Sequence, residues 1–289
     1  MKKTIYLLFV LIIVLFLFSG CIIEDRINRL DKIFNNEAIL FDNAHSQTAG
    51  NADWTIRGGF SDFADDLKNR GANVYEWGND EYGSNQRDDD TSITYEVISK
   101  YKVYVIPEPN IPFTKDEQNA VIKYIENGGR VFFIADHIGA DRNNDGWDAV
   151  EIFNGFLKGK HIIETKKIYA DDFVGRLGFR FREKQYSESP MVKIKEHEIT
   201  KGIKETGAWA GTSEYIIDNE NISGIIYYSK ETWGAYVIAG RYGSGKFVAI
   251  GDSSPIDDGT GTSGDKLYDG YYYGDNRELM INIIKWLVE

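Results

Sequence analysis

Four continuous apolar segments of strand length constrain the fold of this chain more than any other feature. They are Ala38 to Phe41, Val103 to Ile106, Val131 to Ala135 and Phe247 to Ile250. Uninterrupted apolar character is typical of parallel strands that are buried on both faces of a sheet. Segments with helical spacing lie between them, including Ser61 to Arg70 and one that opens with the capping box Thr114 to Glu117. Strand alternating with helix predicts an α/β doubly wound fold.

The alternation of strand and helix stops between residues 225 and 250. Three apolar segments follow one another there with only glycine-rich turns between them, which predicts antiparallel pairing. The last helix, Arg277 to Val288, is expected to start with Asp275 and Glu278 as a capping pair. We therefore predict a mostly parallel, flavodoxin-like sheet with an antiparallel extension near the C-terminus, in one domain of residues 37–289.

The only cysteine, Cys21, follows an apolar segment from Ile5 to Phe18 that Lys2 and Lys3 precede. A positive start, a short apolar middle and small residues before the cysteine predict a lipoprotein signal peptide, residues 1–20, followed by a tether, residues 21–36. The alternative is a tilted single-pass anchor, although the segment is shorter than the roughly 20 residues that span a bilayer. Either interpretation places the domain in the cell envelope, on the extracytoplasmic face of a membrane. Lipidation of Cys21 would leave no thiol for a disulfide or for catalysis.

The net charge of -12 and the absence of a Lys/Arg cluster argue against nucleic acid as a partner, because cations supply most of the affinity for phosphate. Metal ions or cationic partners fit this charge better. Gly240 to Lys246 has the spacing of a phosphate-binding loop, but Phe247 replaces the Ser or Thr and a strand follows. This segment is therefore predicted to be a hairpin turn, and no nucleotide cofactor is expected.

Polar side chains follow each of the four apolar strands. Loops at the carboxyl ends of parallel strands converge, and ligands bind there. The set expected to act in catalysis or to orient a catalytic group is His45, Glu108, Asp136, His137 and Asp252, and the neighbours expected to bind ligand are Asn43, Asn110 and Ser253. In this interpretation a histidine is the general base or a metal ligand, and a carboxylate fixes its tautomer. The alternative is that these residues only cap helices and close turns.

Residues 141–146, DRNNDG, match the opening of a calcium loop, with oxygen ligands at alternate positions and a glycine at the sharp turn. Ile152 occupies the twelfth position, where the bidentate glutamate belongs. The sequence predicts a divalent metal, calcium above others, as the cofactor, held by Asp141, Asn143, Asp145 and Asp148. The alternative is an Asx-rich turn before a helix over residues 148–157.

Two other features of the late sequence could contribute to a site. A tyrosine-rich loop that includes Tyr271 suits the apolar faces of sugar rings, and equally a packed lid or a protein contact. Gly251 to Ser254 is similar to the nucleophile block of GDS-type esterases, but those chains require a histidine near their end. Here the last histidine is His197, so a triad would need His45 or His137 from across the sheet.

Several short motifs resemble the class I glutamine amidotransferase-like superfamily, and within it the trehalose-utilisation-type domains and the auxiliary domains of gliding-type ABC transporters. They run in order over nearly all of the mature chain: Gly128 to Val131 leading to Asp136-His137 and Trp147, His197 to Gly202, Glu214-Tyr215, and Gly243 to Ser253. The resemblance implies the α/β fold and a ligand-binding place for Trp147. Superfamily amidotransferases carry a cysteine nucleophile where Asp136-His137 falls in this chain, so glutamine amidotransferase activity is not expected.

Taken together, these features predict a membrane-anchored lipoprotein whose domain binds a polar small molecule or glycan together with a divalent metal. If the protein is an enzyme, a hydrolase is the expected class. The alternatives are a non-catalytic accessory or scaffold protein of a surface or transport complex and, third, a metal-dependent nuclease, which the charge opposes.

Overall fold

The computed structural model describes residues 32–78 and 92–289. Cys21, the signal peptide and residues 21–31 of the tether lie outside the described residues. The rest of the predicted tether already contacts the fold, because Phe34 is fully buried and its backbone N–H donates to Arg70.

Five parallel strands form the half of the sheet that carries the candidate site. They are β1 (Ala38–Asp42), β2 (Asn73–Trp77), β3 (Val103–Ile106), β4 (Arg130–Ile134) and β12 (Gly245–Ile250). Their order across the sheet is β2-β1-β3-β4-β12, which is the flavodoxin-like order. The doubly wound α/β prediction is confirmed, and all five carboxyl ends lie at one edge of the sheet.

The sheet continues beyond β12 with antiparallel strands, as predicted. Next in order are β11 (Ala235–Tyr242), β10 (Ile222–Tyr227) and β7 (Lys193–Ile194), and β9 (Glu214–Ile216) joins β11 to β5 (Phe179–Phe181). The two residues between β11 and β12 form the predicted hairpin turn. A separate pair, β6 (Tyr186–Met191) with β8 (Thr206–Gly211), was not predicted, because these strands are partly exposed and lack a continuous apolar run.

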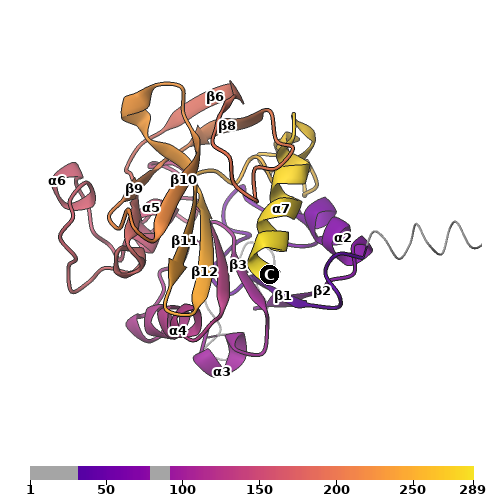
Figure 1. Cartoon of the computed structure of the whole chain (residues 1–289), viewed down its shortest axis with the longest axis horizontal. Coiled ribbons are helices and arrows are strands. Elements are labelled where there is room, and N and C mark those ends of the chain that lie inside the picture. The colour runs from indigo at the N-terminus through magenta and orange to yellow at the C-terminus, as the bar shows by residue number, and fades with distance from the viewer. Residues whose placement is uncertain (1–31, 79–91) are drawn as a thin grey trace, which may run out of the picture.

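Three longer helices cover the sheet: α2 (Ser61–Asn69), α4 (Lys115–Glu126) and α7 (Asn276–Val288). Short helices are α3 (Tyr95–Ile98), α5 (Ala149–Phe153) and α6 (Lys160–Ile163), with 3₁₀ turns at η2 (Val174–Leu177), η3 (Glu231–Trp233) and η4 (Gly270–Tyr272). Figure 1 shows α4 and α7 on different sides of β11 and β12. The capping box at Thr114 is confirmed: the Thr114 hydroxyl accepts the backbone N–H of Glu117, and the Glu117 carboxylate accepts the backbone N–H of Thr114.

Two local helix predictions were wrong. Asp275 does not cap α7 with its side chain; its Oδ2 instead accepts the backbone N–H groups of Lys204, at 2.7 Å, and Glu205. The helix expected over residues 148–157 ends at Phe153, because Gly155 and Phe156 adopt positive φ angles of 73° and 67° that cannot continue a right-handed helix.

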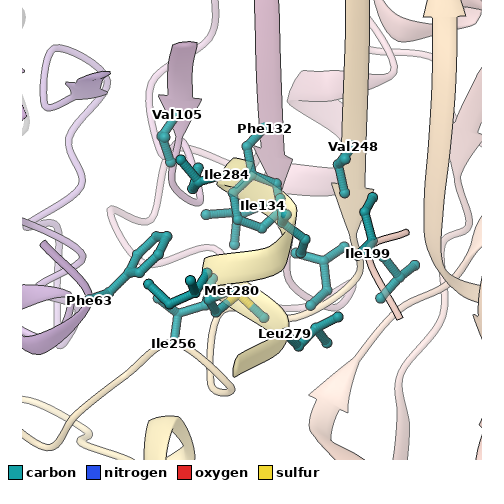
Figure 2. Packing of buried hydrophobic residues seen from close by; sticks show 14 of the residues in the cluster. Phe63, Val105, Phe132, Ile134, Ile199, Val248, Ile256, Leu279, Met280 and Ile284 are labelled. Atoms are coloured by element: carbon teal, nitrogen blue, oxygen red, sulfur yellow. The ribbon is translucent and has the colours of Figure 1, made fainter. Parts of the chain in front are cut away.

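The alternating side chains of the parallel strands enter two different cores. Val105, Phe132 and Ile134 face α2 and α7, as Figure 2 shows for the labelled residues around Met280 and Ile284. The intervening side chains of β3 and β4 face α4 and α5 in a second cluster. Both faces are therefore sealed by helices, which explains the continuous apolar runs.

Residues 160–172, which include α6, are anchored to β5 by one arginine. Arg180 is fully buried and forms two hydrogen bonds with the buried carboxylate of Asp172, at 2.7 and 2.8 Å. Its remaining N–H groups donate to the carbonyl oxygens of residues 162, 163, 165 and 167. This one side chain thus satisfies four carbonyl oxygens of the segment, and Lys166, which donates to the Ile216 and Ile217 carbonyls, adds a second attachment.

Candidate functional site

Three predicted carboxylates from three neighbouring strand ends lie close enough to interact, and two of them flank one arginine. Glu108 follows β3, Asp136 follows β4 and Asp252 follows β12, and all three are buried. Arg142, from the loop after β4, places its guanidinium between Glu108 and Asp136. We name these four residues the carboxylate–arginine cluster. Its residues come from the three segments that follow β3, β4 and β12, which the sheet order places side by side.

The Arg142 guanidinium is held on every side. It donates to both oxygens of Glu108, to Asp136 Oδ2 at 2.7 Å and to Asn51 Oδ1 at 2.9 Å. It also lies over the ring of Trp54, 5.4 Å from the centroid. Charge-assisted, multidentate contacts of this kind fix both position and orientation, so the guanidinium is a rigid part of the site.

Burial and mutual repulsion keep two of the carboxyl groups protonated above their usual pH range. Burial raises the pKa of Asp136 well above its ordinary value, and the neighbouring Glu108 and Asp252 add to the effect against Arg142. Burial raises the pKa of Asp252 to about 7, although the backbone N–H groups of Trp209 and Ser254 donate to its carboxylate. One cation cannot neutralise three buried carboxylates, so the cluster retains a proton near neutral pH.

We expect the protein to be more stable at pH 5 than at pH 8. Burial raises the pKa of both Asp252 and Asp257 to about 7 from 3.8, and folding therefore favours their protonated forms. Their stabilising effect is complete below pH 4 and is lost as the pH rises towards and through 7. Two such groups predict a loss of at least about 2 kcal/mol from pH 5 to pH 8, which corresponds to a Tm lower by about 5 °C.

Thermal unfolding measured over this range tests that expectation. Glu117 and Asp66 do not cancel this trend: burial acts to raise their pKa values, but hydrogen bonds from His45 and Arg277 outweigh it and lower both, so their effect falls below pH 4. Burial lowers the pKa of His197, which acts in the opposite direction between pH 5 and 8, but this one half-buried group offsets only part of the effect of the two carboxyl groups. The variant Asp252→Asn should reduce the slope, which separates this carboxyl from the general effect of net charge. A stability that is flat or rises with pH would contradict the assignment.

His45 does not take part in the carboxylate–arginine cluster. Its Nδ1 lies 2.6 Å from Asp42 Oδ2, its Nε2 lies 3.8 Å from Glu117, and its ring stacks on Phe113 with centroids 3.6 Å apart. The imidazole is fully buried between β1 and the N-terminus of α4. These contacts favour a structural role over the predicted catalytic one, which remains a prediction.

His137 lies instead at the wall of an open pocket above the cluster. The pocket has a volume of about 370 Å³ and is lined by Gly50, Asn51, His137, Gly139, Ala140, Asp141, Arg142, Asn144 and Lys266; we name it the rim pocket. Nδ1 of His137 is 2.6 Å from the Ile138 carbonyl oxygen and must carry the proton there, which leaves Nε2 as the basic nitrogen. Among the five predicted catalytic residues, His137 is the one that lines this pocket.

The predicted calcium loop is held by its own backbone. The Asp141 carboxylate accepts the N–H groups of Asp145, at 3.0 Å, and Gly146, at 2.9 Å, while Asp148 caps α5 and accepts from Gly139. Asn143 donates to Asp145 and to the Asn110 carbonyl. Within residues 32–78 and 92–289, no three His, Cys, Asp or Glu side chains are grouped to hold a metal ion. This geometry is an Asx-rich turn and gives the calcium prediction no support.

The predicted ligand-binding residues lie outside the lining of the rim pocket. Ser253 is buried and donates to Glu108 at 2.9 Å, so it supports the cluster. Asn110 donates to two backbone carbonyls beside it, and Asn43 is buried near the end of β1. Trp147 packs on Phe156, with ring centroids 4.5 Å apart.

Tyr271 belongs to the core cluster that also contains Phe63 and Leu279. Its hydroxyl donates to Asp66 of α2 at 2.7 Å, and Arg277 of α7 donates to the same carboxylate. The side chain is fully buried beside Phe63, so the tyrosine joins two helices. Tyr271 is therefore packed into the core, and its ring offers no face to a sugar.

Three residues of the site were missed in the sequence: Arg142, Asn51 and Lys266. Arg142 stands inside the acidic turn, between the predicted calcium ligands Asp141 and Asn143. Gly50 packs against the Arg142 backbone, and any larger residue in its place would clash, because a Cβ on residue 50 would lie 2.2 Å from the Arg142 carbonyl oxygen. Lys266 reaches the pocket because its N–H donates to the Asn51 carbonyl at 2.9 Å. A cation beside a set of predicted buried carboxylates was the available signal.

Comparison with known proteins identifies the fold. No protein-family model matches the chain, and neither does any curated protein. Among solved structures, the mmIFT52 N-terminal domain has a TM-score of 0.57 at 14% identity, over 87% of this chain and 97% of that domain. Cytoplasmic protein STM1381 from Salmonella typhimurium LT2 has a TM-score of 0.50 at 11% identity, over 88% and 99%.

A ThuA-like protein from Bacteroides uniformis is also similar, with a TM-score of 0.46 at 14% identity, over 88% of this chain and 91% of the other. At identities this low, the likenesses with the two higher scores establish the fold alone. They agree with the α/β architecture predicted from the apolar strands.

Proposed function

We propose that the rim pocket binds a polar small molecule or glycan that carries an anionic group. The observation that carries the proposal is the fixed Arg142 guanidinium at the base of the pocket, between Glu108, Asp136 and Asn51. Because that position is fixed before a ligand arrives, little side-chain entropy is lost on binding.

The other charged groups at the pocket support an anionic ligand. Lys266 is exposed at the mouth, while the one acid in the lining, Asp141, is engaged by backbone N–H groups. The protonated state of Asp136 reduces the negative charge beneath Arg142. Arg142 and Lys266 together therefore favour a ligand with a carboxylate or a phosphate. The pocket is locally cationic even though the whole chain has a net negative charge.

A matched pair of sugars tests the proposal. Glucuronate and glucose differ only in a carboxylate, and citrate and phosphate extend the set of anions. We expect ligand-observed NMR to detect binding of at least one of the three anions, and any glucuronate binding to exceed glucose binding at least five-fold. The variant Lys266→Gln should lower the affinity for the anion at least three-fold. Binding of glucose equal to glucuronate, or no binding by any of the three anions, would contradict the proposal.

A second candidate function is hydrolysis of the bound ligand, with His137 as general base. The observation in its favour is the tautomer, which leaves Nε2 without a proton at the pocket wall. Ser253 does not serve as the nucleophile in this scheme, because it is buried against Glu108; a water molecule does. Turnover of nitrophenyl esters or glycosides that His137→Ala abolishes would support it, and an absence of turnover favours the accessory-protein alternative.

The lipid anchor on Cys21 is part of the proposal, and the signal-like sequence before it is the support. None of the helices among the described residues is long and apolar enough to cross a membrane. We expect Cys21→Ser to move the protein from the membrane fraction to the soluble fraction, because the acyl chains provide the attachment. Detergent phase partition of both forms measures this, and unchanged membrane retention of the variant would favour the single-pass anchor.

A further inference from the structure

The chain enters the fold at the edge of the sheet opposite to the rim pocket. Lys32, the first described residue, lies against Gly71, and the Phe34 backbone N–H donates to the Arg70 carbonyl just before β2. β1 then starts at Ala38, in register with the first residue of β2. The chain therefore arrives at the amino ends of the parallel strands, whereas the rim pocket lies beyond their carboxyl ends.

Basic side chains gather at these amino ends. Arg130 is the first residue of β4, Lys102 directly precedes β3, and Arg241 pairs with β12 near the start of that strand. The C-terminus of α7 reaches the same edge, because Arg130 donates to the Leu287 carbonyl at 2.9 Å. We name the seven exposed or half-buried cations of this region the basic edge: Lys32, Arg70, Lys100, Lys102, Arg130, Arg241 and Lys285.

The basic edge carries an excess of positive charge. The acids near it are Glu37, Glu126, Glu198 and Glu289. Among residues 32–78 and 92–289, none of its seven cations forms an ion pair, and exposed pairs use other cations such as Arg57 and Lys68. Acids crowd the opposite edge instead: burial raises the pKa of Asp53, and the charges of Asp265 and Glu76 add to the effect. The charge of the domain is thus divided between two edges.

The sequence contains no run of Lys or Arg that would indicate this surface. Each strand start or helix end contributes only one or two of the cations, and the order β2-β1-β3-β4-β12 brings them to one edge. Cations gathered in this way act on an anionic surface through their summed field, which at 0.1 M salt extends about 10 Å. The basic edge therefore needs a partner that is both anionic and close.

The proposed anchor places such a partner within reach. Cys21 and Lys32 are eleven residues apart, a distance of at most about 40 Å along a fully extended chain. Lys and Arg side chains close to a membrane are attracted to its anionic headgroups. The acidic carboxyl edge is repelled by the same headgroups, so both edges favour one orientation of the domain.

We propose that the basic edge docks on anionic phospholipid and holds the rim pocket away from the membrane, open to soluble ligands. This inference rests on the proposed anchor at Cys21. It adds an orientation that the anchor does not provide, because a tether alone allows the domain to turn either edge towards the membrane.

Lysine labelling of the full chain, held on vesicles by its own anchor, tests the proposal. One set of vesicles contains phosphatidylcholine alone, and the other contains equal parts of phosphatidylcholine and phosphatidylglycerol. At about 0.05 M salt we expect acetylation of Lys32 and Lys102, followed by mass spectrometry, to be at least three-fold slower on the anionic vesicles. Lys266 at the rim pocket should react equally on both. The difference at the basic edge should disappear at about 0.5 M salt, where charges are screened.

Two double variants with the same loss of charge complete the test. Arg241→Gln with Lys285→Gln removes two exposed cations of the basic edge and should reduce the difference in labelling to less than two-fold. Lys193→Gln with Lys230→Gln is the matched control, because both lysines are exposed outside that edge and lie over aromatic rings, as Arg241 does. The control should leave the difference unchanged.

Retention on the neutral vesicles reports the anchor alone, so the two possible failures are distinguishable. A chain that stays on both kinds of vesicle and shows equal labelling keeps its anchor but overturns docking on lipid, which would assign the basic edge to a soluble acidic partner. Slower labelling of Lys266 on the anionic vesicles, or a difference that survives the Arg241 and Lys285 substitutions, would also overturn the proposal. Loss of the chain from the neutral vesicles would overturn both the anchor and this inference.

Discussion

Replacing Arg142 with methionine is expected to abolish anion binding at the rim pocket and to lower the free energy of unfolding by about 3 to 5 kcal/mol. The side chain is only 12% exposed, and Glu108, beneath it, is fully buried. Removing the guanidinium leaves Glu108 with the Ser253 hydroxyl as its one remaining hydrogen bond in the cluster. A buried carboxylate without its cation carries nearly the full cost of desolvation.

Chemical denaturation and the anion titration measure the two effects of Arg142→Met separately. The double variant Arg142→Met with Glu108→Gln should regain part of the stability, because the uncompensated charge is gone, but should not regain binding. Arg57→Met is the matched control: that arginine is 76% exposed and pairs with Glu76 at the surface, so its loss should cost no more than about 1 kcal/mol. Equal losses for Arg142→Met and Arg57→Met would refute the cluster as described.

Arg180→Met is expected to destabilise the protein by a similar amount, about 3 to 5 kcal/mol, without touching the rim pocket. The substitution leaves the Asp172 carboxylate charged and fully buried. It also removes the hydrogen bonds that Arg180 donates to the carbonyl oxygens of residues 162, 163, 165 and 167. The loss should appear locally, as faster hydrogen exchange over residues 160–172, as well as in global unfolding.

The control for Arg180 uses its own partner. Arg180→Met with Asp172→Asn removes the stranded charge and should be less unstable than the single variant. Anion binding should persist in both variants wherever they remain folded. If exchange over residues 160–172 stayed as slow as in the wild type, the arginine would not be what holds that segment.

The sequence predicted the parts of the fold in which one signal dominates. Strands β1, β3, β4 and β12 are buried on both faces and read as continuous apolar runs. The pair β6 and β8 lacks that signal, since Tyr186–Met191 is mostly exposed or half-buried. Their pairing depends on a tertiary position that no local pattern encodes.

The candidate site was predictable to the same extent. The strand-end rule correctly brought Glu108, Asp136 and Asp252 to one edge, because that edge is set by the topology alone. It could not tell that His45 would turn towards Asp42 and Phe113, since side-chain direction after a strand depends on the loop. For the same reason Arg142, eight residues beyond the end of β4, emerged only from the structure.

The position of β12 governs when the domain can fold. This strand lies between β4 and β11 in the middle of the sheet, yet it begins only at Gly245, and α7 follows it. Until that late part of the chain is available, β4 has an unpaired edge and a partly uncovered face. The long sequence separation of these contacts predicts slow folding. A chain that lacks the strand completing its centre keeps this edge and its apolar face exposed, so C-terminal truncations before Gly245 should be prone to aggregate.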